Sequence, residues 1–325
     1  MTDLALLSRF AHAALAHYEL GADVSIELIN LSENATYRVD AAGGKRFALR
    51  IHRQGYHSRE AIASELSWLM ALRQDGVVTT PIPLTGRDGE WIQLVTVDAA
   101  SRHAVLSAWE EGREPGVGED LSAHFATLGE VTARMHLHAK AWRRPAGFTR
   151  HVWSWETALG DAQPHWGRWR DGLGMDDPKR DLFGQAAKLV RHRLEAFGSG
   201  PDEFGLSHCD LRLANLLVDG DAVKVLDFDD CGFSWYLYDA ATPVSFYEHL
   251  PQVPGLIRNW LSGYRRVVDL GQREEDEIPT FLLLRRLLLV AWIGSHRETE
   301  LARSMGVEYT AQTVDLAREY LKRMG

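Results

Sequence analysis

The chain has 325 residues, which is enough for one large or two medium-sized domains whose core needs no disulfide or metal for stability. Its net charge of −9 gives no indication of nucleic acid or an anionic membrane as a partner, so we expect neither, although a local basic patch is compatible with this charge. The only cysteines, Cys209 and Cys231, exclude a disulfide framework and a cysteine-rich zinc site. The N-terminal segment lacks the cationic start of a signal peptide. The most apolar run, Phe281–Gly294, is too short to span a bilayer. These features predict a soluble, cytoplasmic protein.

The first third of the chain has the pattern of a small antiparallel sheet that carries helices. Apolar residues at helical spacing predict an amphipathic helix within residues 1–20 and a second helix over Ser58–Arg73. Short runs rich in β-branched and aromatic residues, separated by turn residues, predict strands. These strands are expected at Val24–Leu31, Ala35–Asp40, Arg46–Ile51, Trp91–Val97 and His103–Trp109.

The stretch Glu110–Asp120 is charged, rich in glycine and proline and without periodicity, so it is the best candidate for a hinge. The hinge would separate an N-terminal lobe, residues 1–109, from a mainly helical C-terminal lobe, residues 121–325. The predicted helices of that second lobe are Leu121–Ala139, Leu182–Phe197, Leu256–Val267, Ile278–Ser295 and Thr310–Arg323. The sequence therefore predicts an α+β fold with two lobes, a small antiparallel β lobe and a larger helical one.

One segment, residues 206–233, interrupts the helical pattern and concentrates the polar chemistry. It predicts a hairpin whose strands, Leu216–Val218 and Val223–Leu226, are joined around Asp219-Gly220. Because a hairpin brings its two flanks together, the polar residues on either side are expected at the same end. These residues are His208, Asp210 and Asn215 before the hairpin, and Asp227, Asp229 and Asp230 after it. Two oxygen ligands beside a third carboxylate suit Mg²⁺, and phosphoryl transfer requires this set.

The spacing H-x-D-x-x-x-x-N, followed by an apolar strand that ends in D-F-D, resembles the catalytic segment of the aminoglycoside phosphotransferase and choline kinase-like families. These families are relatives of the protein kinase fold and include homoserine-kinase-like and stress-response-kinase-like enzymes. The resemblance implies a protein-kinase-like fold that binds ATP and Mg²⁺, with GTP not excluded. It also implies transfer of the γ-phosphate to a hydroxyl of a small molecule.

The resemblance assigns a role to each polar residue of this segment. It makes Asp210 the catalytic carboxylate, and it makes Asn215 and Asp227 the magnesium ligands. Asp229 would be a second metal or substrate contact, while His208 would anchor the loop. Asp239 resembles the buried aspartate that braces the catalytic loop in these families.

The N-terminal lobe resembles the same families in order and spacing. Leu31–Val39, with Ser32 and Asn34, is similar to the hairpin that covers the nucleotide, although it lacks the G-x-G-x-x-G of protein kinases. Arg50 stands in the place of the phosphate-binding lysine, and Glu65 in the following helix is its expected ion-pair partner. The alternative is an ordinary surface pair between a strand and a helix.

Several further residues are candidates for a functional role, and each also has a structural explanation. Substrate contacts are expected among Arg212, Asp230, Trp153, Trp155 and His296. The tryptophans could instead form a packed satellite core, and Asp229 and Asp230 could belong to a solvated turn or a helix cap. The arginines of the apolar helix, Arg285 and Arg286, need either an internal carboxylate or a substrate anion, with internal pairing favoured. We expect both cysteines to be small, buried packing residues.

Three other functions each fit part of the sequence. A phosphatase of the haloacid dehalogenase type needs a later lysine and a later acidic pair, but the only lysine after Lys224 is Lys322 and no Asp-Asp pair follows Asp230. A protein Ser/Thr kinase needs a peptide-docking segment, and Asp227 is followed within a dozen residues by Tyr238. A non-catalytic nucleotide-binding module is disfavoured because the catalytic residues are intact. The acceptor stays open among amino alcohols, hydroxy amino acids, sugars and aminoglycosides, as does the oligomeric state.

Overall fold

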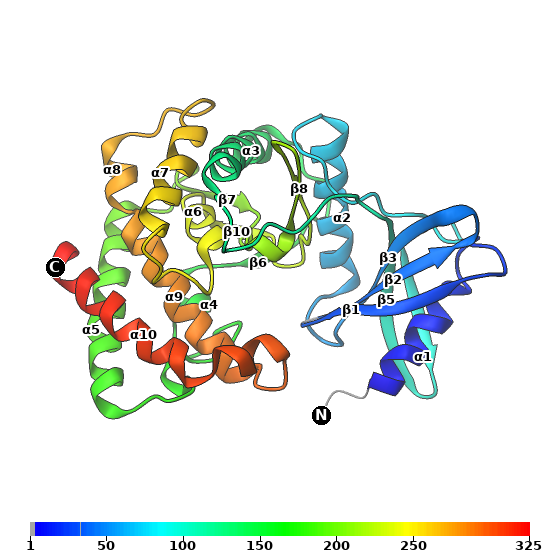
Figure 1. Ribbon diagram of the computed structural model, residues 1–325, viewed down its shortest axis with the longest axis horizontal. Helices are drawn as coiled ribbons and strands as arrows, with labels where there is room; N and C mark the ends of the chain where they lie inside the picture. Colours follow the sequence, from blue (N-terminus) through cyan, green and yellow to red (C-terminus); the bar gives the residue numbers. More distant parts are fainter. Residues whose placement is uncertain (1–3, 33) are drawn as a thin grey trace. The chain divides into compact units, whose positions relative to one another are not determined.

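The computed structural model describes residues 4–32 and 34–325, and the chain forms two compact units (Figure 1). The first unit contains residues 1–75, 80–111 and 144–149. The second contains residues 76–79, 112–143 and 150–325. The first unit is mainly an antiparallel sheet and the second is mainly helical, which confirms the predicted α+β fold class.

The first unit is built on a five-stranded antiparallel sheet with the strand order β1-β2-β3-β5-β4. Its helices are α1, Leu4–Leu15, and α2, Arg59–Gln74. The strands are β1 Ser25–Leu31, β2 Ala35–Ala41, β3 Lys45–Ile51, β4 Ile92–Val97 and β5 Ala100–Ala108. All seven elements agree with the sequence prediction to within a few residues.

The core of the first unit follows from two hydrophobic patterns. In β2, buried residues alternate with partly exposed ones, so Tyr37 and Val39 enter the core from one face of the sheet. In α1, Leu7 and Phe10 lie on one helix face and belong to the same buried cluster. Helix α2 begins after Ser58, whose Oγ accepts a hydrogen bond from the Ala61 N–H at 3.2 Å and caps the helix.

The second unit consists mainly of α-helices, with two small β structures among them. The hairpin β8–β9 is antiparallel, and a three-stranded sheet has the order β6-β10-β7. The helices are α3 Ser122–Ala141, α4 Trp155–Ala158, α5 Asp177–Phe197, α6 Tyr238–Ala241, α7 Val253–Tyr264, α8 Gln272–Asp276, α9 Ile278–Ser295 and α10 Glu300–Met324. The strands are β6 His151–Val152, β7 Phe204–Ser207, β8 Leu216–Asp219, β9 Ala222–Val225 and β10 Gly232–Trp235.

Helices α5 and α10 begin five and ten residues earlier than the hydrophobic pattern predicted. Helix α10 was expected from Thr310 but begins at Glu300, because the Thr299 side chain caps it. Gly306, with φ 51°, interrupts its helical backbone and obscures the periodicity in this part of the sequence. Helix α5 similarly begins at Asp177, where the Asp176 side chain is the cap. In both helices a side-chain cap sets the first residue, and the hydrophobic periodicity alone does not indicate this position.

The long helices of the second unit pack closely enough to exclude side chains at some contacts. A Cβ atom added to Gly129 of α3 would lie 1.9 Å from the carbonyl oxygen of Trp260 in α7. Helix α9 is apolar enough to be a candidate membrane span together with α8, but 78% of the apolar window is buried inside the protein. It also contains the buried residues Arg285 and Arg286. These features identify α9 as a core helix of this unit.

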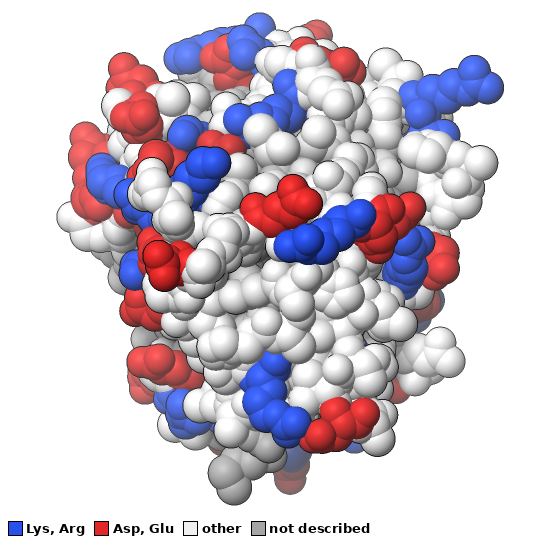
Figure 2. All heavy atoms as spheres, turned by 90° about the vertical axis from the view of Figure 1, so that its right-hand side faces the viewer, with Lys and Arg blue, Asp and Glu red and all other residues white. Residues whose placement is uncertain are grey.

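Charged side chains of both signs are interspersed on the face of the molecule drawn in Figure 2. Ion pairs also occur within the first unit, where Arg38 lies 2.8 Å from Glu27 and 2.9 Å from Asp40. A basic stripe is the feature that a nucleic-acid-binding surface requires. The mixed charges on this face do not form one.

Candidate active site

The loop that follows strand β7 carries the H-x-D-x-x-x-x-N motif and is held by a buried aspartate. The Asp239 carboxylate in α6 accepts hydrogen bonds from the backbone N–H groups of His208, at 3.0 Å, and Cys209, at 2.7 Å. Cys209 has φ 66°, a left-handed conformation that side-chain-bearing residues rarely adopt. The predicted bracing role of Asp239 is confirmed, because its two oxygens fix the turn that presents Asp210.

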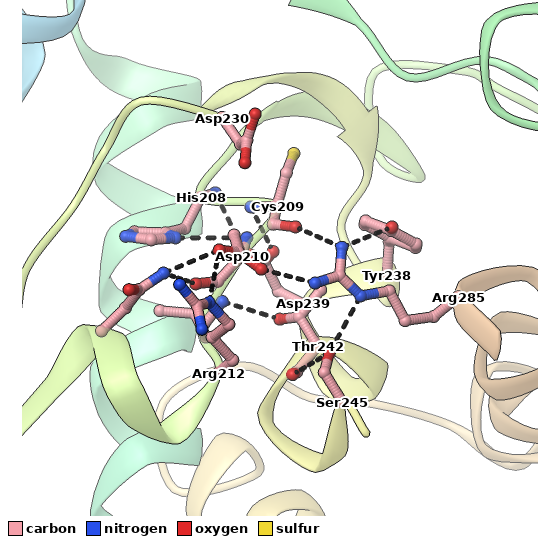
Figure 3. A network of polar contacts seen from close by, with 12 residues as sticks. His208, Cys209, Asp210, Arg212, Asp230, Tyr238, Asp239, Thr242, Ser245 and Arg285 are labelled. Carbon is pink, nitrogen blue, oxygen red and sulfur yellow. Dashed lines mark hydrogen bonds and ion pairs between the residues drawn. The ribbon is translucent and has the colours of Figure 1, made fainter. Parts of the chain in front are cut away.

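Three side chains hold the Asp210 carboxylate at the centre of this loop (Figure 3). Its Oδ2 accepts hydrogen bonds from Asn215 Nδ2 at 2.7 Å and from Arg212 Nε at 3.3 Å. Its Oδ1 accepts a hydrogen bond from Arg285 Nη2 at 2.5 Å. Burial raises the pKa of the Asp210 carboxyl, but the positive charges of Arg285 and Arg212 more than offset this effect. The pKa of Asp210 therefore lies below its usual value, and the group is a carboxylate at neutral pH.

The β8–β9 hairpin brings Asn215 and Asp227 to the same end, as the sequence predicted. The backbone N–H of Leu226 donates to the carbonyl oxygen of Asn215 at 2.8 Å. His208 Nε2 bonds to the Leu226 carbonyl oxygen at 3.0 Å, which supports the predicted role of His208 as an anchor. Asp227 has φ 48°, so a second residue of this region is held in a strained backbone conformation.

The donor atoms of this end of the hairpin fit a magnesium ion. Asn215 directs its Nδ2 toward Asp210, so its Oδ1 points away from that carboxylate as an available oxygen ligand. Asp227 supplies a half-buried carboxylate at the same end of the hairpin. It lies two residues after Val225, which pairs with Leu216, the residue next to Asn215. Among the residues that the structure describes, no cluster of three or more His, Cys, Asp or Glu side chains is arranged to hold a metal. Mg²⁺ commonly takes only one or two protein oxygens and fills its other positions with water and phosphate.

The segment after Asp227 is held in place by two side chains of residues 150–153. Arg150 is buried and donates hydrogen bonds to the carbonyl oxygens of Cys231, at 2.6 Å, and Asp229. Trp153 is also buried, and its Nε1 donates to the carbonyl oxygen of Asp230 at 2.9 Å. No motif marked Arg150 in the sequence, because its partners lie about 80 residues away. The side chains of Asp229 and Asp230 are buried rather than part of a solvated turn.

The remaining substrate-contact candidates occupy different environments. Trp153 packs edge-on against Trp166, with 5.0 Å between ring centroids, which also fits the packed-core alternative. His296 is buried and stacks on Trp292 at 4.9 Å. Trp155 is the half-buried first residue of α4. Arg212 is half-buried beside Asp210. Contact of these residues with a substrate stays a prediction.

Arg285 and Arg286 both pair internally, as the sequence analysis favoured. Arg285 contacts Asp210, while Arg286 Nη1 lies 2.6 Å from Glu248 Oε2. The sequence could identify two buried arginines in need of partners, but it could not assign Arg285 to the catalytic loop 75 residues away. The thiols of Cys209 and Cys231 are buried, and burial raises the pKa of Cys209. Their predicted role as packing residues agrees with this burial.

In the first unit, the predicted ion pair between Arg50 of β3 and Glu65 of α2 is present. Arg50 Nη1 lies 2.7 Å from Glu65 Oε1, and the Glu65 side chain is fully buried. The pair is therefore not an ordinary surface pair. Asn34 Oδ1 accepts a hydrogen bond from the Arg53 N–H at 3.0 Å, and the Ser32 N–H donates to the Asn34 carbonyl oxygen at 3.1 Å. These bonds shape the β1–β2 turn, in which residue 33 lies outside the described residues.

Comparison with known proteins identifies the family. Residues 25–273 match the model of the phosphotransferase enzyme family. Amicoumacin kinase of Bacillus subtilis (strain 168) is 27% identical over 293 residues, which cover 85% of this chain and 81% of that protein. Homoserine kinase of Methylobacillus glycogenes is 26% identical over 275 residues, covering 82% of this chain and 79% of that enzyme.

Solved structures agree with this assignment. The structure of a microcompartment-associated aminopropanol kinase superposes with a TM-score of 0.90, is 44% identical and covers 99% of both chains. The amicoumacin kinase hAmiN, solved with AMP-PNP, Ca²⁺ and Ami, has a TM-score of 0.77 at 21% identity and covers 98% of this chain and 93% of that one, which supports the fold alone. The chain therefore belongs to the phosphotransferase enzyme family and is a small-molecule kinase with a protein-kinase-like fold.

Proposed function

We propose that this protein is an ATP- and Mg²⁺-dependent kinase that phosphorylates the hydroxyl group of a small amino alcohol. The observation that carries this proposal is the bonded set of Asp210 and Asn215, placed beside Asp227 by the β8–β9 hairpin. A carboxylate that orients a hydroxyl and two oxygen ligands for a metal are the parts that phosphoryl transfer needs. We expect the enzyme in the cytoplasm.

Each residue of the set has a distinct role in the proposed reaction. Asp210 binds the acceptor hydroxyl, orients its oxygen for attack on the γ-phosphorus and accepts its proton. As the new P–O bond forms, the bond between the γ-phosphorus and the β,γ-bridging oxygen breaks and ADP leaves. Asn215 holds the Asp210 carboxylate and offers its own Oδ1 to the metal together with Asp227. When bound, Mg²⁺ would neutralise charge on the phosphate oxygens. Positioning supplies most of the acceleration in this reaction class, so a carboxylate with a lowered pKa is adequate.

Arg50 and Glu65 have a supporting role in the proposed function. The buried Glu65 carboxylate fixes the Arg50 guanidinium at 2.7 Å. A fixed guanidinium can bind phosphate oxygens through two parallel hydrogen bonds, which a lysine ammonium cannot do. We assign Arg50 to the α- and β-phosphates of the nucleotide, with Ser32 and Asn34 shaping the turn that covers it.

Two features favour an amino alcohol as the acceptor. The first is the similarity to the aminopropanol kinase, which is 44% identical over nearly the whole chain. The second is the local charge, because Asp229 and Asp230 lie two and three residues after Asp227 and suit a cationic ammonium group. A hydroxy amino acid, a sugar or an aminoglycoside would need additional or different recognition groups.

A protein Ser/Thr kinase is the second candidate, and the chain after Asp227 disfavours it. This segment forms strand β10, which pairs with β7 and β6, and then enters helix α6 at Tyr238. The backbone of Gly232–Trp235 is thus engaged in a largely buried sheet. A substrate peptide requires an accessible docking segment, whereas a small acceptor does not.

An ADP-release assay with matched acceptors tests the proposal. We expect turnover with 1-amino-2-propanol or ethanolamine, which carry both an amine and a hydroxyl. Propylamine lacks the hydroxyl and must give no turnover, while 1,2-propanediol lacks the amine and should show at least a tenfold lower kcat/KM. Homoserine, an aminoglycoside and a generic protein substrate test the other acceptor classes. Repeating the assay with GTP determines the nucleotide preference.

The results separate the alternatives. Phosphorylation of the protein substrate in preference to every amino alcohol would contradict the proposed acceptor class. Tight Mg²⁺-ATP binding without turnover of any acceptor would indicate the non-catalytic nucleotide-binding module. Loss of turnover in Asp210→Asn is expected in all catalytic cases, so retained turnover would refute the assignment of Asp210.

A further inference from the structure

Arg285 occupies an unusual position for a charged side chain, because it lies within the apolar helix α9 and is only 1% exposed. Its neighbour Arg286 is equally buried. Consecutive residues of an α-helix point about 100° apart, so the two guanidinium groups meet different surroundings. Arg285 reaches the catalytic loop, whereas Arg286 reaches Glu248 and helix α10.

The Arg285 guanidinium is fixed by partners on several sides (Figure 3). Its Nη2 donates to Asp210 Oδ1 at 2.5 Å, its Nε donates to Ser245 Oγ at 2.9 Å, and its Nη1 donates to the Tyr238 hydroxyl at 3.1 Å. The guanidinium also lies over the ring of Trp166, 5.4 Å from its centroid. A side chain held by directed bonds to three different residues has little freedom to move.

This fixed group completes the hydrogen bonding of Asp210. Asn215 and Arg212 occupy Oδ2, while Arg285 is the side chain that binds Oδ1. The terminal torsion of an aspartate is soft, so bonds to Oδ2 alone would leave the plane of the carboxylate poorly defined. A carboxylate has about four lone-pair sites, and these three donors leave one of them on Oδ1. Arg285 therefore determines where the remaining acceptor site of Asp210 points.

We propose that Arg285 is a positioning residue for phosphoryl transfer: by binding Oδ1 of Asp210 it aims the remaining lone pair of that oxygen at the acceptor hydroxyl. This inference rests on the proposed function, in which Asp210 orients the hydroxyl. Arg285 itself need not touch either substrate. Its effect is on the alignment of the attacking oxygen, which appears in kcat rather than in nucleotide binding.

Arg286 provides a matched control within the same helix. It is also 1% exposed, and it also forms an ion pair with a buried carboxylate, Glu248, at 2.6 Å. Its other partners, Thr313 Oγ1 and the Tyr309 carbonyl oxygen, belong to α10. Substitution of either arginine removes a buried ion pair, but of the two only Arg285 donates a hydrogen bond to Asp210.

The test compares Arg285→Lys and Arg285→Met with Arg286→Lys, with 1-amino-2-propanol as the acceptor probe. Lysine keeps the charge, but its single nitrogen cannot reach all the partners that the three guanidinium nitrogens contact. We therefore expect kcat to fall about tenfold in Arg285→Lys and about a hundredfold in Arg285→Met. The KM for ATP should stay within about threefold of the wild-type value. Arg286→Lys should lower the melting temperature by a similar amount but keep kcat within about threefold. Equal losses of kcat in Arg285→Lys and Arg286→Lys, or a loss confined to KM, would overturn the proposal.

A double-mutant cycle provides the second measurement. If Arg285 acts through Asp210, adding Arg285→Met to Asp210→Asn causes no further loss of the residual kcat. A full additional hundredfold loss would show that Arg285 acts independently. Turnover retained by Asp210→Asn alone would refute the proposed function, whereas its loss with full activity of Arg285→Met would refute only this inference. Should Arg285→Met fail to fold, Ser245→Ala combined with Tyr238→Phe loosens the guanidinium without removing its charge. This pair must then lower kcat at least threefold, and an unchanged kcat would overturn the proposal.

Discussion

The Oδ1 atom of Asp239 lies 2.7 Å from the backbone nitrogen of Cys209 and accepts its hydrogen bond. Through this bond a residue of α6 stabilises the left-handed conformation of Cys209, which directly precedes Asp210. The other carboxylate oxygen accepts bonds from the His208 N–H and His136 Nε2, both at 3.0 Å. One fully buried side chain thus holds the backbone of the catalytic loop.

Substitution of Asp239 is therefore expected to destabilise the protein. Asp239→Ala leaves the N–H groups of His208 and Cys209 buried without an acceptor, which costs about 3 kcal/mol of unfolding free energy. Urea denaturation measures this loss. Asp202→Ala removes an exposed carboxylate paired with Lys140 and should change the midpoint little. Equal midpoints for both variants would contradict the bracing role of Asp239.

Asp227→Asn tests the metal assignment. A carboxamide binds a hard cation less strongly than a carboxylate, so half-maximal activity should require at least about tenfold more Mg²⁺. Titration of activity with Mg²⁺ at saturating ATP measures the shift. Asp221→Asn changes an exposed aspartate in the turn of the same hairpin and should leave the titration unaltered. An unchanged Mg²⁺ requirement in Asp227→Asn would exclude Asp227 as a ligand.

Arg50→Met tests the nucleotide assignment. The substitution removes a guanidinium that Glu65 orients, so the KM for ATP should rise about tenfold. Steady-state kinetics with varied ATP measures this change. Arg46 lies on the same strand in an exposed pair with Glu111, and Arg46→Met should alter the KM by less than about twofold. If both variants behave alike, Arg50 has no special contact with the nucleotide.

Gly129→Ala tests the close contact between α3 and α7. The added Cβ would lie 1.9 Å from the carbonyl oxygen of Trp260, so the helices must separate at a cost of about 3 kcal/mol. In Gly184→Ala of α5, the new Cβ meets only a ring atom of Trp169 at 3.9 Å. The higher helix propensity of alanine should stabilise that variant by roughly 0.5–1 kcal/mol. Thermal unfolding should show a lower melting temperature for Gly129→Ala and a higher one for Gly184→Ala. Destabilisation of equal size in both variants would contradict the packing argument.

Local patterns in the sequence determined much of the fold and part of the candidate site. Short runs between turn residues predicted the strands of the first unit, and the turn at Asp219-Gly220 predicted the β8–β9 hairpin. The hairpin fixes the neighbourhood of Asn215 and Asp227 through bonds between residues close in sequence. Asp210 is five residues from Asn215, so their hydrogen bond also follows from a short motif. These features are local, and single-sequence patterns record local constraints.

Only the tertiary structure decided which distant side chains hold that motif. Asp239, Arg150 and Arg285 lie about 30 to 80 residues from the groups that they bind. The sequence identified Arg285 as a buried charge in need of a partner, because burying an unpaired charge is costly. It could not choose between Asp210 and the other carboxylates, since that choice depends on how α9 packs against the catalytic loop. Long-range packing therefore determines which residues orient the catalytic carboxylate. Such packing leaves no periodic pattern in the sequence.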